Sequence, residues 1–178
     1  MSEILLQVTR EAQLELLMKQ YGRKIVHFVY LLTKDRSMAE DVTQEAFIKV
    51  YQHLHTFRGE SQIQTWLYKI ALNEAKKQLR RWSFRHLFYT PRVAELKDEQ
   101  ESHSPRLLET IEKSELADMI MQLPFAYRQV IALHYYQDLT IQEVGHILGV
   151  SEGAARNKLY RARNRLKEIL QKEGYAWE

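Results

Sequence analysis

Apolar residues recur every three or four positions along most of this chain, the spacing that places them on one face of an α-helix. In the first part of the chain the pattern divides into four segments, separated by Gly22, by the polar turn 33–37 and by the polar loop 58–62. Residues 25–32 are rich in β-branched side chains and resemble a strand, but their length and their helical neighbours favour a helix. We therefore expect four helices around one core in residues 1–82.

Several helix ends carry their own sequence signals. A Ser or Thr followed three residues later by Glu or Gln is a capping box, in which each side chain accepts a free backbone N–H of the other residue. The pattern occurs at the pairs Ser37/Glu40, Ser61/Gln64 and Thr140/Glu143. Gly149 suits a left-handed helix end, and Ser151 suits the start of the last helix.

Periodicity is lost over residues 83–104, where an aromatic and basic stretch gives way to an acidic one. A connection of this length without a helical pattern is typical of a linker. The helical pattern returns at Pro105, a good first helical position, and a further helix is expected from Pro124 through His134.

The end of the chain combines a short helix, the turn at Gly149 and a longer helix over residues 151–172. This order is that of a helix-turn-helix. The predicted fold is therefore all-α, with two small helical domains: a four-helix domain at 1–82 and a helix-turn-helix domain at 105–178, joined by a flexible linker at 83–104.

The composition is that of an ordinary globular protein, with 45% hydrophobic and 28% charged residues in a chain of 178. The chain contains no cysteine, which excludes disulfides and thiolate metal sites. No apolar run reaches the roughly 20 residues of a membrane span, and the N-terminus lacks a signal-peptide pattern. We therefore expect a cytoplasmic protein without membrane insertion.

The distribution of charge is more informative than the net charge of +3. Residues 151–172 carry seven Lys or Arg and two Glu, and residues 76–81 carry four cations and no acid. Basic stripes on a nearly neutral chain indicate a polyanionic partner for part of the surface.

The last helix places polar and basic side chains opposite its apolar stripe. These side chains are Arg156, Asn157, Tyr160, Arg161, Arg163 and Asn164. The second helix of a helix-turn-helix enters the major groove, where Arg can bond bidentately to guanine and Asn to adenine. Lys158, Arg163 and Arg165 are better suited to phosphates. The alternative is a solvated basic face on a structural helix.

The fourth expected helix carries a second mixed surface. Its flank consists of Trp66, Lys69, Asn73, Lys76, Lys77 and Arg80. Cations beside an aromatic platform suit single-stranded or unstacked DNA. Alternatively, Trp66 belongs to the core and the lysines only solubilise the helix. The loop 57–63 is polar and short, and it could wall a pocket for one flipped base.

Three polar residues, Asp41, Gln44 and Glu45, lie near the start of the third expected helix. Acids there could simply complement the helix dipole. The sequence shows no nucleophile–base pair, no Gly-rich phosphate loop and no His cluster with metal-ligand spacing. We therefore expect no catalysis, no metal and no cofactor.

Three motifs together resemble bacterial sigma factors of the extracytoplasmic-function type. They are AEDVTQEAFIKVY at 39–51, FRGESQIQTWLYKIALNEAKKQLRR at 57–81 and LTIQEVGHILGVSEGAARNKLYRARNRLK at 139–167. The resemblance implies a protein that binds core RNA polymerase and directs promoter-specific transcription initiation. It also implies a role in an envelope or stress response.

The resemblance also implies roles for individual residues in the first domain. Asp41, Gln44 and Glu45 match the surface that docks on the polymerase β′ subunit, which also argues against the helix-dipole explanation. The pocket for a flipped base of the melted promoter element matches Phe57, Arg58, Gly59, Glu60, Ser61 and Asn73. The surface that meets the duplex edge and the separated strand matches Trp66, Lys76, Lys77, Arg80 and Arg81.

In the second domain, the resemblance implies reading of the distal, double-stranded promoter element. The matching positions are Ser151, Arg156, Asn157, Lys158, Tyr160, Arg161 and Arg163. The implied partners are core polymerase through β′ and β, promoter DNA in double- and single-stranded form, and an anti-sigma factor that could itself be membrane-bound. The alternative is an autonomous helix-turn-helix regulator that acts without polymerase; such proteins usually dimerise, and no dedicated dimer seam is evident.

Overall fold

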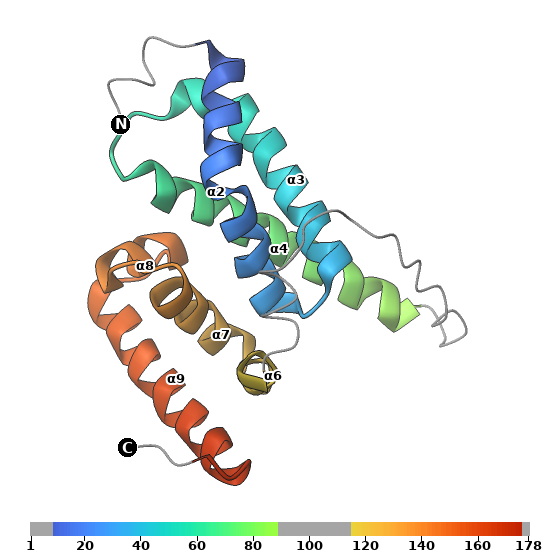
Figure 1. Ribbon diagram of the computed structural model, residues 1–178, viewed down its shortest axis with the longest axis vertical. Helices are drawn as coiled ribbons and strands as arrows, with labels where there is room; N and C mark the ends of the chain where they lie inside the picture. The colour runs from blue at the N-terminus through green and yellow to red at the C-terminus, as the bar shows by residue number, and fades with distance from the viewer. Residues whose placement is uncertain (1–8, 89–114, 176–178) are drawn as a thin grey trace.

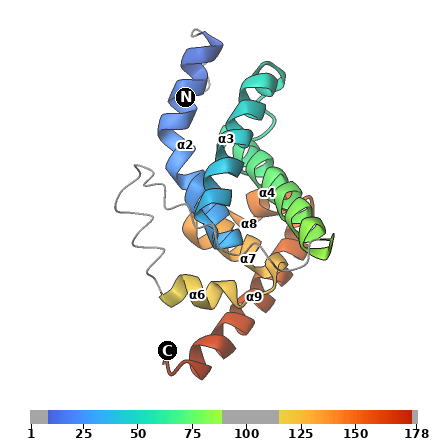
Figure 2. The same ribbon diagram turned by 90° about the vertical axis from the view of Figure 1, so that its right-hand side faces the viewer.

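The computed structural model describes residues 9–88 and 115–175, and every regular element in these residues is helical, which confirms the all-α prediction (Figure 1). The first unit consists of α2 (Arg10–Thr33), α3 (Arg36–His53), the 3₁₀ turn η1 (Leu54–Thr56) and α4 (Ile63–Phe88). The second unit consists of α6 (Glu115–Met121), α7 (Phe125–Ile131), the π-helical turn η2 (Ala132–Tyr136), α8 (Ile141–Leu148) and α9 (Glu152–Lys172). The two units lie one above the other in both ribbon views (Figure 2).

The predicted break at Gly22 is wrong, because α2 runs through it without interruption. Buried residues continue along one stripe on both sides of the glycine, at Leu17, Tyr21, Ile25 and Phe28. Gly22 lies off this stripe, and a Cβ there would meet open space. The packing of the stripe outweighs the roughly 1 kcal/mol that a glycine costs inside a helix. In its described residues, the first unit is therefore built from three long helices instead of four.

The capping predictions have different outcomes. α3 is capped by Asp35, whose carboxylate accepts the backbone N–H of Met38 at 2.8 Å, so Ser37 already lies inside the helix. α4 begins at Ile63, so Ser61 lies outside the cap position. In the second unit, the Thr140/Glu143 capping box, the left-handed Gly149 (φ 69°) and the Ser151 cap are all confirmed.

The helix expected from Pro124 through His134 ends earlier. α7 stops at Ile131, and η2 replaces its last part. Asp138, two residues after η2, has a left-handed backbone (φ 53°). The chain after η2 is also held by a hydrogen bond of 2.7 Å between Nδ1 of His134 and the backbone carbonyl of Leu139. Pro105 and residues 89–104 of the expected linker lie outside the described residues, whereas α4 continues through residues 83–88.

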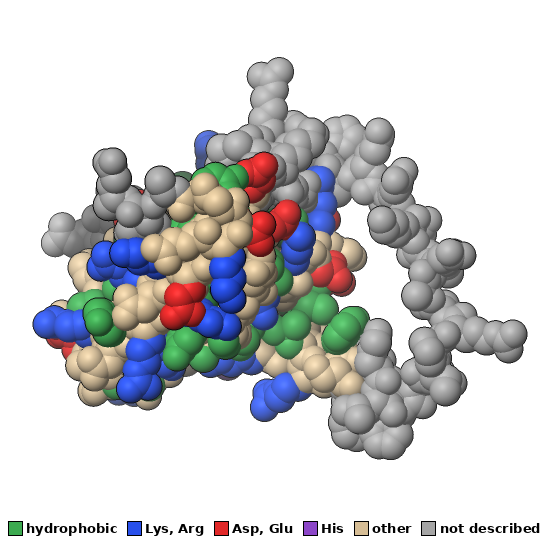
Figure 3. Space-filling model, turned by 90° about the horizontal axis from the view of Figure 1, so that it is seen from below, with side chains coloured by type: hydrophobic (Ala, Val, Ile, Leu, Met, Phe, Trp, Pro, Cys, Tyr) green, Lys and Arg blue, Asp and Glu red, His purple; other side chains and the backbone are tan. Residues whose placement is uncertain are grey.

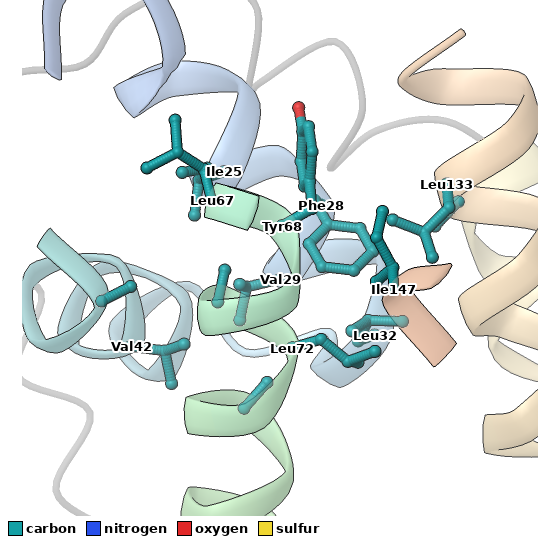
Figure 4. Packing of buried hydrophobic residues seen from close by; sticks show 14 of the residues in the cluster. Ile25, Phe28, Val29, Leu32, Val42, Leu67, Tyr68, Leu72, Leu133 and Ile147 are labelled. Atoms are coloured by element: carbon teal, nitrogen blue, oxygen red, sulfur yellow. The ribbon is translucent and has the colours of Figure 1, made fainter. Parts of the chain in front are cut away.

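Buried apolar residues form two clusters. Four residues at four-residue spacing along α3 and η1 are buried in the larger cluster: Val42, Ala46, Val50 and Leu54. This cluster does not stop at the first unit but continues into η2, α8 and the start of α9 (Figure 4). A smaller cluster, which includes Ile120, Ala162 and Leu166, belongs to the second unit alone. The second unit therefore has its own core and also shares one with the first unit.

Candidate functional site

The face of α3 that carries Asp41, Gln44 and Glu45 is exposed, as the sequence predicts for a docking surface. Asp41 and Glu45 make no ion pair with any residue that the structure describes. Beside them lies a groove of about 690 Å³ between α2 and α3, with Asp41 and Gln44 in its lining. Asp41 in the groove lining and Glu45 on the same exposed face are two carboxylates without cationic partners, and both are available to a partner.

The groove also contains residues that the sequence reasoning missed. Met18 and Ile48 line it, and their side chains are 49% and 47% exposed. Large apolar side chains left in water beside polar ones are typical of a protein-binding surface. Ile48 follows Gln44 by four residues and so lies on the same face of α3; an isoleucine on a polar helix face is the signal that could have identified it.

The loop before α4 contacts the helix through an aromatic pair, Phe57 from the loop and Trp66 from α4. The rings of Phe57 and Trp66 have centroids 5.2 Å apart and an interplanar angle of 41°. Both are half-buried, so Trp66 is neither a full core residue nor a free platform. Gly59 has a left-handed backbone (φ 71°), a conformation that glycine adopts without the steric cost of a Cβ. Arg58, Gly59 and Glu60 are exposed, and Ser61 is half-buried.

The cations of α4 are not equivalent. Lys77 pairs with Glu74 at 3.4 Å, and Glu74, which is only 6% exposed, also pairs with Lys49 of α3 at 3.6 Å. Lys49 therefore joins α3 to α4 through Glu74, whereas Lys77 pairs with Glu74 inside α4. Asn73, Arg80 and Arg81 are exposed, and within the described part of the chain neither Lys76 nor Arg80 has an ion pair.

Lys76 lies in a crowded, positively charged region. Burial lowers its pKa, and the charges of Lys158 on α9 and of Arg80 lower it further. Asn73, Lys76 and Arg80 line one side of a cleft of about 1010 Å³, and Phe125 and Arg128 of α7 line the other. Burial also lowers the pKa of Arg128, whose buried Nε has no hydrogen-bond partner among the described residues. Arg128 could not be identified from the sequence, because its place beside α4 depends on how the units pack.

The polar face of α9 is open to solvent along its length. Ser151 caps the helix, and its hydroxyl accepts the N–H of Ala154 at 3.2 Å. The exposed residues of this face include all but one of those predicted: Arg156, Asn157, Tyr160, Arg161 and Arg163. The exception, Lys158, is half-buried toward α4.

Two arginines on α9 form ion pairs within the helix: Arg156 with Glu152 at 2.5 Å and Arg165 with Glu168 at 2.6 Å. Figure 3 views the end of the molecule at which α9 finishes, and Lys and Arg side chains are spread over this face with fewer acidic ones between them. Exposed pairs of this kind contribute at most about 1 kcal/mol, so a DNA base or phosphate can replace the glutamate.

The described residues contain no group of three or more His, Asp or Glu side chains placed to hold a metal ion. In the same residues no helix is both long enough and apolar enough to cross a bilayer.

Two family models match most of the chain. Residues 17–84 match sigma-70 region 2, and residues 113–166 match sigma-70 region 4. The chain is 31% identical over 165 residues to the RNA polymerase sigma-H factor of Pseudomonas aeruginosa, covering 88% of this chain and 86% of that protein. It is also 31% identical over 170 residues to the ECF RNA polymerase sigma-E factor of Haemophilus influenzae, again covering 88% of this chain and 86% of that protein.

Solved structures share the fold. CnrH in complex with the cytosolic domain of CnrY has a TM-score of 0.72 at 18% identity, covering 97% of this chain and 96% of that chain. The sigma factor RpoE of Bartonella quintana, in complex with the anti-sigma factor NepR, has a TM-score of 0.68 at 22% identity, covering 88% and 96%.

Proposed function

This chain belongs to the extracytoplasmic-function type of RNA polymerase sigma factors, and we propose that its two units divide promoter recognition between them. As a member of this family it directs the polymerase in promoter recognition and is not an enzyme. In the proposal, the first unit binds the polymerase and the melted promoter strand, and the second unit binds the distal duplex element.

The α3 face is the proposed contact with the β′ subunit of core polymerase. Asp41, Gln44 and Glu45 provide charge and hydrogen bonds, and Met18 and Ile48 provide apolar area beside them. Protein interfaces combine a buried apolar centre with a polar rim, and this surface has both parts. The β subunit is a further proposed contact of the whole protein.

The loop before α4 and the exposed flank of α4 are the proposed site for the melted element. Phe57, Gly59 and Asn73 are expected near a flipped base, with Arg58, Glu60 and Ser61 around it. Trp66, Lys76, Lys77, Arg80 and Arg81 are expected along the strand and at the duplex edge. The observations in support are the contact of Phe57 with Trp66 and the absence of ion pairs for Lys76 and Arg80 among the described residues.

The exposed face of α9 is the proposed reading surface for the distal element. Ser151, Lys158 and Arg163 are expected at phosphates, and Arg156, Asn157, Tyr160 and Arg161 at or near base edges. The domain boundaries 1–82, 83–104 and 105–178 remain part of this proposal, because residues 89–114 lie outside the described range.

Regulation by an anti-sigma factor completes the proposal. Two solved structures with the same fold are complexes: one with the anti-sigma factor NepR and one with the cytosolic domain of CnrY. We propose a cytoplasmic protein that such a partner, membrane-bound or free, holds inactive until an envelope or stress signal arrives. No cofactor is expected.

One observation carries the proposed function: an acid-bearing groove suited to a protein and a basic helix suited to DNA occur on the same chain. The test is transcription in vitro with core polymerase, this protein and a library of genomic promoters, with the start sites mapped. New start sites that share two separated sequence elements are expected. An autonomous regulator would instead bind duplex DNA specifically without polymerase and would create no start sites, and that result would exclude the proposal.

A further inference from the structure

The first turn of α9 carries a carboxylate on an otherwise basic surface. Glu152 and Glu168 are the two acidic residues among positions 151–172, against seven lysines and arginines. Glu152 is the first residue of α9, whereas Glu168 lies near its end. The N-terminal residues of a recognition helix are those that meet base edges, so Glu152 belongs to the part of α9 nearest to DNA in the proposed complex. A negative charge at this place repels phosphates and lowers the affinity for DNA of any sequence.

The usual roles of an acid at a helix start account for Glu152 only in part. An acid there complements the helix dipole. The N-cap bond, however, is made by Ser151, whose hydroxyl accepts the N–H of Ala154 at 3.2 Å. The side chain of Glu152 bonds elsewhere: its Oε1 accepts a hydrogen bond from Nη2 of Arg156 at 2.5 Å. The carboxylate is therefore paired with one of the residues assigned to base edges.

The backbone at Glu152 is held close to α8. The N–H of Val150 donates to the carbonyl of Gly145 at 3.0 Å. A Cβ at Gly145 would lie 3.0 Å from the carbonyl oxygen of Val150 and 3.6 Å from Cα of Glu152, so a larger residue would push the start of α9 away. Together with the left-handed Gly149, this contact fixes where the first turn of α9 begins. A residue that orients its neighbour has to stand on such a rigid element.

The ion pair leaves Arg156 able to bind a base. The side chain of Arg156 is 68% exposed and that of Glu152 is 47% exposed, so both groups reach solvent. A guanidinium has five N–H donors, and a guanine in the major groove takes two of them. One bond to Glu152 therefore leaves enough donors for the bidentate contact. A side chain that is ordered in advance also loses less conformational entropy on binding.

The same ion pair disfavours a phosphate at Arg156. A phosphate oxygen beside this guanidinium would also lie beside the Glu152 carboxylate, and two negative charges repel each other. Guanine presents its neutral O6 and N7 acceptors and avoids most of this repulsion. Arg163 has no ion pair in the described part of α9, so nothing there opposes a phosphate. The carboxylate therefore gives Arg156 a preference that the other arginine lacks.

We propose that Glu152 is a specificity-determining residue of the α9 surface: it holds Arg156 in place for a guanine base and keeps this arginine off the phosphates. Glu152 acts through Arg156 and is therefore a positioning residue. The inference rests on the proposed function, which places α9 in the major groove of the distal element. It adds a base to that function: the distal element has a guanine opposite Arg156, and the selection for this guanine depends on a carboxylate.

Base discrimination by the holoenzyme tests this role. The probe is a promoter fragment identified by start-site mapping, together with its single-base variants across the distal element. Arg156→Ala locates the position that this arginine reads. At that position, Glu152→Ala should lower the preference for guanine over the other bases about 3- to 10-fold. The affinity of the same variant for fragments without the guanine should rise about twofold, because a charge that repels phosphates is removed.

Glu168→Ala is the matched control. It removes a carboxylate from the same helix and also frees an arginine, since Glu168 pairs with Arg165 at 2.6 Å. It should change the affinity for all fragments alike and leave the preference for guanine unchanged. Glu152 and Glu168 are both exposed, so the melting temperature of each variant should stay within a few degrees of the original protein.

A double variant separates positioning from a general effect of charge. When Glu152→Ala is added to Arg156→Ala, it should no longer alter the base preference, because the arginine that it positions is absent. A change in base preference that persists without Arg156 would show that Glu152 acts by another route and would overturn the inference.

The remaining outcomes distinguish this inference from the proposed function. If Arg156→Ala relaxes base choice but Glu152→Ala does not, the inference is overturned and the proposed function stands. An equal loss of affinity for Glu152→Ala on every fragment, with a lower melting temperature, makes Glu152 a helix-start acid and also overturns it. If Arg156→Ala itself weakens binding equally on every fragment, the base-reading role of Arg156 in the proposed function fails, and the inference fails with it.

Discussion

The exposed faces of α3 and α9 both carry charged residues, but they are built for different partners. On α3, Asp41 lines a groove that exposes Met18 and Ile48, and neither Asp41 nor Glu45 has an ion pair in the described chain. On α9, long basic side chains cover the surface, and Arg156 and Arg165 pair with glutamates of the same helix. A protein partner gains free energy from apolar area, whereas DNA offers mainly phosphates and polar base edges. The exposed aliphatic side chains Met18 and Ile48 therefore distinguish the α3 surface from that of α9, where the large exposed apolar side chain is the aromatic ring of Tyr160, 67% exposed.

Charge reversal on α3 should have the largest effect. Asp41→Lys with Glu45→Lys should weaken binding to core polymerase by about a hundredfold or more, because like charges would face the partner's cations. Both positions are exposed, so the melting temperature should stay within a few degrees. Fluorescence anisotropy with labelled protein and core enzyme measures the affinity.

The matched control reverses the same number of charges at the end of α9, with Glu168→Lys in the helix and Glu173→Lys at its C-cap, and should retain polymerase binding. If the α3 variant binds as well as the original protein, the docking surface lies elsewhere.

Removal of a base contact on α9 comes next. Arg156→Ala should cost about 1–3 kcal/mol of promoter binding and relax base choice at one position. Binding of the holoenzyme to a set of single-base promoter variants measures both effects. Arg165→Ala, also an arginine paired with glutamate but in the later part of α9, should change affinity only slightly and without base dependence. An equal loss for Arg156→Ala on every sequence would reduce this residue to a phosphate contact.

The apolar part of the α3 surface should contribute a smaller share. Ile48→Ser should weaken polymerase binding about fivefold, because the substitution removes apolar contact area from the interface. Ile48 is not part of the protein's own core, so the fold should be unaffected. Leu16→Ser is the control, because Leu16 is similarly exposed on α2 (48%) but does not line the groove. Titration calorimetry with core enzyme measures the affinity of each variant. Equal losses for both variants would mean that the groove is not the contact.

The smallest effect is on the pH dependence of the melting temperature, and it tests the burial of His27 on α2. Burial and then Arg23 lower the pKa of His27 from its ordinary value of 6.5. The neutral ring is therefore favoured in the fold, and its contribution is complete above about pH 6.5 and is lost as the pH falls toward the folded-state pKa. Melting temperatures between about pH 7.5 and 5 should fall less steeply for His27→Gln than for the original protein.

The exposed His53→Gln on α3 should leave this slope unchanged. A slope that is the same for His27→Gln and the original protein would show that His27 titrates alike in the folded and unfolded states.

Local signals in the sequence were sufficient for α8, α9 and the turn between them, but not for the end of α7 or for η2. Thr140 with Glu143, Gly149 and Ser151 act on the backbone within a few residues, so the helix-turn-helix was predictable in detail. The exposed polar face of α9 followed from its period. The continuity of α2 could not be predicted in this way. The free-energy cost of Gly22 inside a helix is local, whereas the packing of Tyr21 and Ile25 that offsets it involves other helices.

The sequence by itself determined the helical periods, the turn chemistry and the residue types of both surfaces, because these depend on neighbours one to four positions away. Only the tertiary structure decided that Met18 and Gln44 line the same groove, that Trp66 meets Phe57, and that Tyr68 is buried against Gln137. These residues come from different elements of the fold. Their existence depends on which apolar faces pack together, and a pattern of neighbours along the chain does not contain that information.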